Sequence, residues 1–294
     1  HPDFTMRQNQ TMEAIKLVYA SVYSRSSRAY FEAIDYKIEE ERMAIVIQQV
    51  VGKQFGTRYY PVISGVAQSY NYYPFSYIKP GDGVAMIALG LGKYVVGGEQ
   101  SFRFCPAYPR LDMITPEQQV QNTQRYFYAI DLEKNTVDLF NGEDATLLSL
   151  DIREAEKDGV LGDCASVWDV ADGCLREGLE CQGPRVLNFP YVIKYDQFPL
   201  CGVLSKILQI IKESMETPVE IEFALKLDQE KNGNPTFYLL QIKHLLREAE
   251  ECAIDLNEIQ RDKLLLHTNQ GMGNGKLEGI TDVVWVDPDL FDKT

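Results

Sequence analysis

VEIEFAL at residues 219–225 and FYLLQIK at residues 237–243 are two strand-like runs separated by the polar turn DQEKNGNP. They predict an antiparallel hairpin with strands over residues 219–227 and 236–242. Because strand side chains alternate between faces, Glu220 and Glu222 share one face, and Gln241 and Lys243 repeat that spacing on the second strand. Antiparallel pairing can therefore place carboxylates, an amide oxygen and an ammonium group side by side.

This polar set has the chemistry of a site for a metal-bound phosphate. Glu222 and Gln241 offer hard oxygen ligands of the kind that Mg²⁺ binds, and Lys243 offers a cation for phosphates that share the metal. An edge hairpin with a solvated polar face explains the same pattern without a ligand. The pattern alone favours this simpler interpretation.

Composition narrows the class of protein. The chain has 294 residues and a formal net charge of −14, which opposes binding to nucleic acid or to an anionic membrane surface. Its 45% hydrophobic and 24% charged residues are typical of a soluble globular chain, and no apolar run is long enough for a membrane span. The chain begins with His1 and shows no secretory signal, so we expect a piece of a longer protein.

The cysteines predict neither a metal centre nor a disulfide framework. Six cysteines include no CxxC pair and no Cys/His ligand quartet, so with three histidines in the chain a zinc site is not expected. A chain of this size does not need disulfides to fold, so we expect reduced thiols and a cytoplasmic location.

Hydrophobic periodicity predicts the other elements. The strongest signals are helices over 11–37 with a break at 24–27, strands over 43–51 and 62–68, a glycine-punctuated segment over 80–98, and a helix over 200–215. Residues 126–130 and 136–140 are expected to form a second hairpin, whereas 142–185 show no dominant period and are expected to form loops and short elements. An acidic helix is expected over 245–262.

Five segments resemble the nucleotide-binding domain of phosphoenolpyruvate synthases and pyruvate phosphate dikinases. The closing hairpin is similar to that family's D-I-E-[WF]-A strand and L-Q-x-R strand. IVIQQVV (45–51) resembles V-Q-x-M-V, ISGVAQS (63–69) resembles S-G-V-x-x-T, and ALGLGKYVVGG (88–98) resembles G-L-G-E-x-V-V-x-G. ASVYSRSSRAYFEAIDY (20–36) resembles A-S-x(6–7)-A-x-x-Y-R. Each motif alone is weak, but all five occur in the order that the family has.

The resemblance implies an α+β chain with an ATP-grasp-like fold, in which two subdomains sandwich ATP. Residues 1–245 would be the C-terminal part of the nucleotide-binding domain, with a mixed or antiparallel sheet, flanking helices and a divergent insertion around 104–200. Residues 246–294 would be a helical and Gly-rich connector toward a swivelling domain. The phosphate-clamping N-terminal subdomain and the phosphohistidine and pyruvate domains would lie outside this chain, since His267 lacks the T-x-H-A context of the carrier histidine.

The site residues are carried over from the matching motifs. Glu222 matches the family's metal-binding acid and Gln241 its second metal or phosphate ligand. Glu220 stands where aspartate is usual and belongs to the ATP-binding set. Lys243 replaces an arginine that touches the phosphates, which keeps the charge of this catalytic position but loses the two-point fork.

The resemblance also bears on two further segments. The resemblance places adenine against the segment formed by Gln48, Gln49 and Val50. Lys93 replaces the glutamate of the Gly-rich motif, a reversal of charge to which the sequence assigns no role.

These correspondences imply an ATP-dependent phosphotransferase that uses Mg²⁺. In the leading hypothesis the parent protein phosphorylates pyruvate to phosphoenolpyruvate through a phosphohistidine, and the isolated chain is inactive because the clamping residues lie elsewhere. Related phosphotransferases of the dikinase, rifampicin or glucan type remain open. So does a degenerate binding module without catalysis, given the replacements at Lys93 and Lys243.

Overall fold

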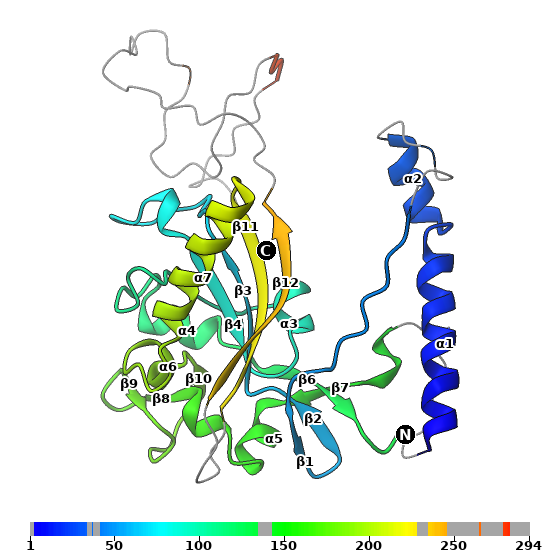
Figure 1. Ribbon diagram of the computed structural model, residues 1–294. Coiled ribbons are helices and arrows are strands. Elements are labelled where there is room, and N and C mark those ends of the chain that lie inside the picture. Colours follow the sequence, from blue (N-terminus) through cyan, green and yellow to red (C-terminus); the bar gives the residue numbers. More distant parts are fainter. Residues whose placement is uncertain are drawn as a thin grey trace.

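The computed structural model describes residues 3–33, 37, 42–134, 143–227, 235–245, 265 and 279–282. The described part is an α+β structure whose helices and antiparallel sheets follow one another along the chain (Figure 1). The expected α+β class is therefore confirmed. The helix expected over 245–262, His267 and nearly all of the connector expected over 246–294 lie outside the described residues.

The central element is a five-stranded antiparallel sheet. Its strand order is β12-β11-β3-β4-β5. The strands are β3 (Ile63–Gln68), β4 (Val84–Ala88), β5 (Phe102–Phe104), β11 (Val219–Lys226) and β12 (Thr236–His244). The predicted hairpin is confirmed, because β11 and β12 pair antiparallel along their length.

Two smaller antiparallel sheets accompany the central one. The first has the order β1-β2-β6-β7 and contains β1 (Lys53–Phe55), β2 (Arg58–Tyr60), β6 (Tyr126–Asp131) and β7 (Leu147–Asp151). The second has the order β10-β8-β9 and contains β8 (Ala165–Asp169), β9 (Cys174–Glu177) and β10 (Arg185–Leu187).

One long helix covers a face of the central sheet. Helix α7 (Leu200–Met215) is the helix expected over 200–215, and it packs against β11 through its apolar stripe (Figure 1). Leu204 and Leu208 of α7 join Ile221 and Leu225 of β11 in the main hydrophobic core. Burial of this stripe is what holds the helix on the sheet, since helices of this length gain most of their stability from packing.

Short helices connect the strands. They are α3 (Lys93–Val96), α4 (Pro116–Gln121), α5 (Ile152–Lys157), α6 (Pro190–Ile193), and the 3₁₀ turns η2 (Pro80–Asp82), η4 (Glu143–Thr146) and η5 (Leu161–Asp163). Helix α4 begins with a full capping box between Thr115 and Gln118, which fixes its first turn.

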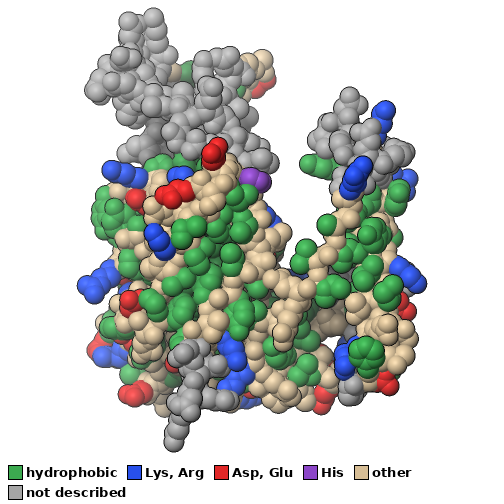
Figure 2. All heavy atoms as spheres, viewed as in Figure 1, with side chains coloured by type: hydrophobic (Ala, Val, Ile, Leu, Met, Phe, Trp, Pro, Cys, Tyr) green, Lys and Arg blue, Asp and Glu red, His purple; other side chains and the backbone are tan. Residues whose placement is uncertain are grey.

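The N-terminal helices stand apart from the sheets. Helices α1 (Phe4–Ser21) and α2 (Arg25–Ala33) confirm the two helical pieces that the sequence predicts, and Figure 1 shows them beside the body of the molecule. Their bounds differ from the prediction, because α1 begins at Phe4 and α2 begins inside the expected break at 24–27. No residue of α1 is buried. Phe4 and Tyr19 of this pair are exposed. Figure 2 shows hydrophobic side chains on the surface of this part of the molecule.

The strand expected over 43–51 is wrong in this structure. These residues run extended from α2 toward β1 without joining a sheet, and Val46 and Ile47 are 85% and 73% exposed. A β-branched run becomes a strand only when a partner satisfies its backbone groups and covers its side chains. Here the described contacts are sparse: the Gln48 side chain reaches the Leu240 carbonyl, and the Tyr59 hydroxyl reaches the Val50 carbonyl.

The middle of the chain consists of short elements, as expected. Residues 142–185, expected to be loops and short elements, include strands β7, β8 and β9. Strand β6 confirms the strand expected over 126–130, but it pairs with β7 (Leu147–Asp151), and residues 136–140 lie outside the described residues. Alternation is hard to see in strands of four or five residues, so packing rather than pattern defines them.

None of the described helices has the length and apolar content needed to cross a membrane.

Candidate functional site

The hairpin places its four polar residues as the sequence predicts. Glu222 pairs with Gln241 and Glu220 pairs with Lys243 across β11 and β12. Residues directly opposite each other in an antiparallel pair point to the same face. The four side chains therefore form one polar patch, which we call the hairpin patch.

The hairpin patch is organised by charge. The Lys243 ammonium lies 2.5 Å from Glu222 Oε1 and 4.0 Å from Glu220 Oε1. Gln68 of β3 donates from Nε2 to Glu220 Oε2 at 2.7 Å. The Glu222 carboxylate raises the pKa of Lys243 above its usual value, so this ammonium stays protonated at neutral pH.

The oxygens of the hairpin patch suit Mg²⁺ better than a metal that needs a full protein cage. Among the described residues no group of three or more His, Cys, Asp or Glu side chains converges on one point. Glu222, Glu220 and Gln241 supply two carboxylates and one amide oxygen. Mg²⁺ is typically held by one or two carboxylates together with water and substrate phosphates, so the donor set fits.

The Gly-rich segment lies over the same face of the sheet. Val66 pairs with both Glu222 and Met86, which places all three on one face. Val66 also belongs to a small hydrophobic cluster with Tyr94 and Val95 of α3. The helix that follows the Gly-rich turn therefore packs on the face that carries the hairpin patch.

Hydrogen bonds fix the Gly-rich turn. The Ser64 hydroxyl donates to the Gly90 carbonyl at 2.7 Å, and the Leu91 amide donates to the Tyr128 carbonyl at 2.9 Å. Gly90 has φ of +88°, and a Cβ there would lie 2.8 Å from the Tyr128 carbonyl oxygen. Glycine is required at this position for both reasons.

Lys93 has a structural partner. Its ammonium pairs with Asp144, and it lies 5.9 Å from the centre of the Tyr128 ring. The charge reversal at this position is thus matched by an acid from the middle of the chain. The partnership ties α3 to the segment before β7.

The segment that the resemblance assigns to adenine reaches the hairpin at one point. Gln48 Nε2 donates to the Leu240 carbonyl at 3.4 Å, beside Gln241. The Tyr59 hydroxyl donates to the Val50 carbonyl at 3.2 Å, and Gln49 is exposed. Of these three residues, Gln48 is the one that the structure brings to the hairpin.

Two residues next to the hairpin patch were not singled out from the sequence. Gln68 holds Glu220, and Ser64 holds the Gly-rich turn, yet both belong to the quoted segment ISGVAQS. Their place in a segment that resembles a family motif indicated that they lie near the site. Their individual roles depend on which strands neighbour β3, which the local sequence does not state.

Gly65→Ala is expected to destabilise the sheet beneath the site. A Cβ at this position would lie 2.6 Å from the Met86 carbonyl oxygen and 2.6 Å from Phe223 Cζ, so the strands must shift. We expect unfolding free energy to fall by about 1–3 kcal/mol in urea denaturation, the usual cost of overpacking. Gly202→Ala is the control, because nothing lies within 4 Å of its Cβ and alanine favours the helix. An equal or smaller loss in Gly65→Ala than in Gly202→Ala would contradict this account.

The fold and the hairpin patch together define an α+β domain with an acid, amide and lysine set beside a Gly-rich turn. Residues 4–263 match the family model for the pyruvate phosphate dikinase, AMP/ATP-binding domain. The match covers most of the chain, so the chain belongs to this family and is an AMP/ATP-binding domain of it. No curated protein matches the chain.

Proposed function

We propose that this chain is the C-terminal part of an ATP-grasp nucleotide-binding domain that holds Mg·ATP on the hairpin patch. Residues 1–245 would form this part, with an insertion around 104–200, and residues 246–294 would connect to a swivelling domain. The observation that carries the proposal is the register of β11 and β12, with Glu222 opposite Gln241 and Glu220 opposite Lys243. The Gly-rich segment over the same face supports it.

Each residue of the patch has a proposed role. Glu222 and Gln241 hold Mg²⁺ through their side-chain oxygens. Glu220 adds a second carboxylate beside them, and the hydrogen bond from Gln68 fixes the orientation of that carboxylate. Bound Mg²⁺ would neutralise charge on the phosphates during transfer. Lys243 stabilises the charge of the transferring phosphoryl group as a single-point cation. The adenine contacts the extended backbone of Gln48, Gln49 and Val50, a segment that joins no sheet.

Lys243 must move for this role. Its ammonium pairs with Glu222 in the structure, where it neutralises a carboxylate that the metal needs. Its side chain is 42% exposed, so it can turn from Glu222 toward a phosphate without unpacking the core. The exchange replaces one ion pair by another and leaves Glu222 available to the metal.

The acceptor is assigned from the family. We propose phosphoryl transfer from ATP to a carrier histidine outside this chain and then to pyruvate, as in a phosphoenolpyruvate synthase. A pyruvate phosphate dikinase, or a related kinase with an antibiotic or glucan acceptor, would use the same nucleotide domain. With pyruvate as the acceptor, we also propose that the protein acts in the cytoplasm.

A non-catalytic binding module is the second candidate. The observation that favours it is the short Lys243–Glu222 pair, which puts a protein cation where the proposed metal belongs. In that case the pair is permanent and stabilises the hairpin. The two candidates differ in whether nucleotide binding depends on Mg²⁺.

The test is calorimetric titration of the chain with ATP, with and without excess Mg²⁺. We expect Mg²⁺ to tighten ATP binding, and Glu222→Gln to remove most of this gain because it deletes the ligand charge at constant volume. Glu213→Gln on α7 is the matched control, since α7 covers the opposite face of the sheet, and it should leave the gain unchanged. ATP binding that ignores Mg²⁺, or a Glu222→Gln variant that keeps the full gain, would favour the non-catalytic module.

A further inference from the structure

A cavity lies at the edge of the central sheet away from the hairpin patch. It encloses about 220 Å³ beside the edge strand β5, and its walls come from β5, α4 and the loop after β3. Its apolar and aromatic lining includes Phe102, Ile114 and Leu187. A cavity of about 150 Å³ is enough to hold benzene, so this one can hold a single ring with a short substituent.

The cavity contains one arginine without an acid. Arg103 is half-buried, and its Nη2 donates to Asn71 Oδ1 at 2.8 Å and to the Tyr73 carbonyl at 3.3 Å. No carboxylate pairs with it in the part of the chain that the structure describes. Burial lowers the pKa of Arg103 from its usual value, and the nearby Tyr73 opposes this effect only in part. An arginine still carries its charge, so a half-buried guanidinium here lacks a counterion.

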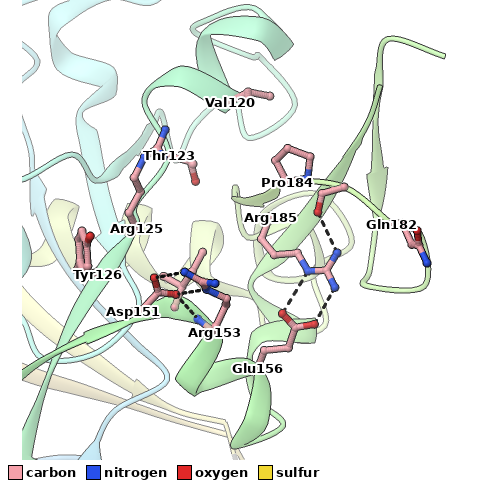
Figure 3. Close-up of a pocket in the computed structure, with 12 residues that line it drawn as sticks. Val120, Thr123, Arg125, Tyr126, Asp151, Arg153, Glu156, Gln182, Pro184 and Arg185 are labelled. Carbon is pink, nitrogen blue, oxygen red and sulfur yellow. Dashed lines mark hydrogen bonds and ion pairs between the residues drawn. The ribbon is translucent and has the colours of Figure 1, made fainter. Parts of the chain in front are cut away.

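The contrast with the neighbouring hollow is direct. That larger hollow, of about 740 Å³, also contains arginines, but Figure 3 shows two of them engaged by acids. Arg153 bonds Asp151 through two nitrogens, and Arg185 bonds Glu156 in the same way. Arg125, the third arginine of the larger hollow, also has no ion pair among the described residues, but it is exposed, so Arg103 differs from it in being half-buried without an acid.

Amide side chains add directional groups to the same cavity. Gln119 of α4 is only 5% exposed, and its Oε1 accepts from Asn188 Nδ2 at 3.5 Å. Its Nε2 has no hydrogen-bond partner among the described residues. Gln124 is different, because Leu89 and Tyr126 backbone groups satisfy it. Gln119 therefore offers an amide donor in the cavity wall that a ligand oxygen can use.

From this combination we infer that the β5 cavity is a binding site for a small monocarboxylate with an apolar or aromatic body. The carboxylate pairs with Arg103 and the body lies among Phe102, Ile114 and Leu187. A single cation favours a monoanion over a phosphate dianion, since a second negative charge would remain uncompensated in an acidic protein.

The β5 cavity is separate from the hairpin patch. Arg103 pairs with Met86, Met86 with Val66, and Val66 with Glu222, so the four lie in one row across the sheet. Three strand spacings of about 4.8 Å put roughly 14 Å between the Glu222 and Arg103 backbones. A carboxylate on Arg103 therefore makes no direct contact with a nucleotide metal on Glu222, and this inference stands without the proposed function.

The test is calorimetric titration of the chain with 3-phenylpropionate, its neutral amide 3-phenylpropionamide, and inorganic phosphate. We expect the acid to bind at least about tenfold more tightly than the amide, the usual effect of one charge-assisted pair. Phosphate should bind more weakly than the acid. Equal binding of acid and amide, tighter binding of phosphate, or no saturation by the acid would overturn the inference.

Variants locate the binding. Arg103→Gln should weaken the acid about tenfold or more and leave the amide unchanged, whereas Arg125→Gln, the matched change in the neighbouring hollow, should have no effect. Because Arg103 also holds the loop at Asn71, Ile114→Trp is a second variant that fills the cavity without touching the guanidinium, and it should block both ligands. Loss of acid binding in Arg125→Gln, or full binding in Ile114→Trp, would place the acid elsewhere and overturn the inference.

Discussion

Glu222→Gln is expected to lower the proposed Mg²⁺-dependent phosphotransfer by about 10²- to 10³-fold. The substitution keeps the side-chain volume on β11 but removes the charge that faces Gln241. Loss of one electrostatic contact to a developing charge typically costs roughly 3–4 kcal/mol in the transition state. Steady-state phosphorylation of pyruvate by wild type and variant measures the effect. Equal rates would exclude the catalytic role of Glu222.

Lys243→Arg is the complementary variant. Arginine restores the two-point fork that the family usually has at this position, so activity should stay the same or rise if Lys243 touches the phosphates. Arginine also remains able to pair with Glu222, which keeps the hairpin patch neutralised. Glu213→Gln serves as the unrelated control and should leave the rate unchanged. A large loss in Lys243→Arg would show that the position needs the compact ammonium, against the proposed role.

Phe223→Ala is expected to be the most destabilising single change near the site. Phe223 is 1% exposed, and its ring stacks on Phe237 with centroids 5.1 Å apart. Truncating a buried phenylalanine typically costs about 3–5 kcal/mol of unfolding free energy, because the cavity does not fully collapse. That is a large share of the roughly 5–15 kcal/mol that holds a domain folded. Urea denaturation followed by circular dichroism measures the loss.

Tyr238→Ala is the matched control for this prediction. It removes an aromatic ring from β12, directly opposite Ala224, but Tyr238 is 37% exposed. The Tyr238 ring buries less surface than that of Phe223, so the expected loss is smaller by about 1–2 kcal/mol. Similar losses in Phe223→Ala and Tyr238→Ala would show that the hairpin is held by something other than the core beneath it.

The sequence was enough to identify the motifs of the chain, but it did not predict that they lie on one face of a sheet. ISGVAQS and ALGLGKYVVGG are separated from the hairpin by more than a hundred residues, and only the pairing of β3 with β11 and β4 places them together. The misassigned strand over 43–51 shows the limit of local pattern. Its sequence has strong strand propensity, yet a strand exists only where another strand completes its hydrogen bonds.

The sequence by itself determined what alternation and composition control: the antiparallel hairpin, the shared face of Glu220 and Glu222, the long helix over 200–215, and the family. These follow from side-chain period and from the residues themselves, both of which are local. Tertiary structure alone decided the pairing of Lys243 with Glu222, the match of Lys93 with Asp144, and the isolation of Arg103 from any acid in the described chain. Each of these depends on which distant segments pack together, because electrostatic partners are set by distance in space rather than by separation along the chain.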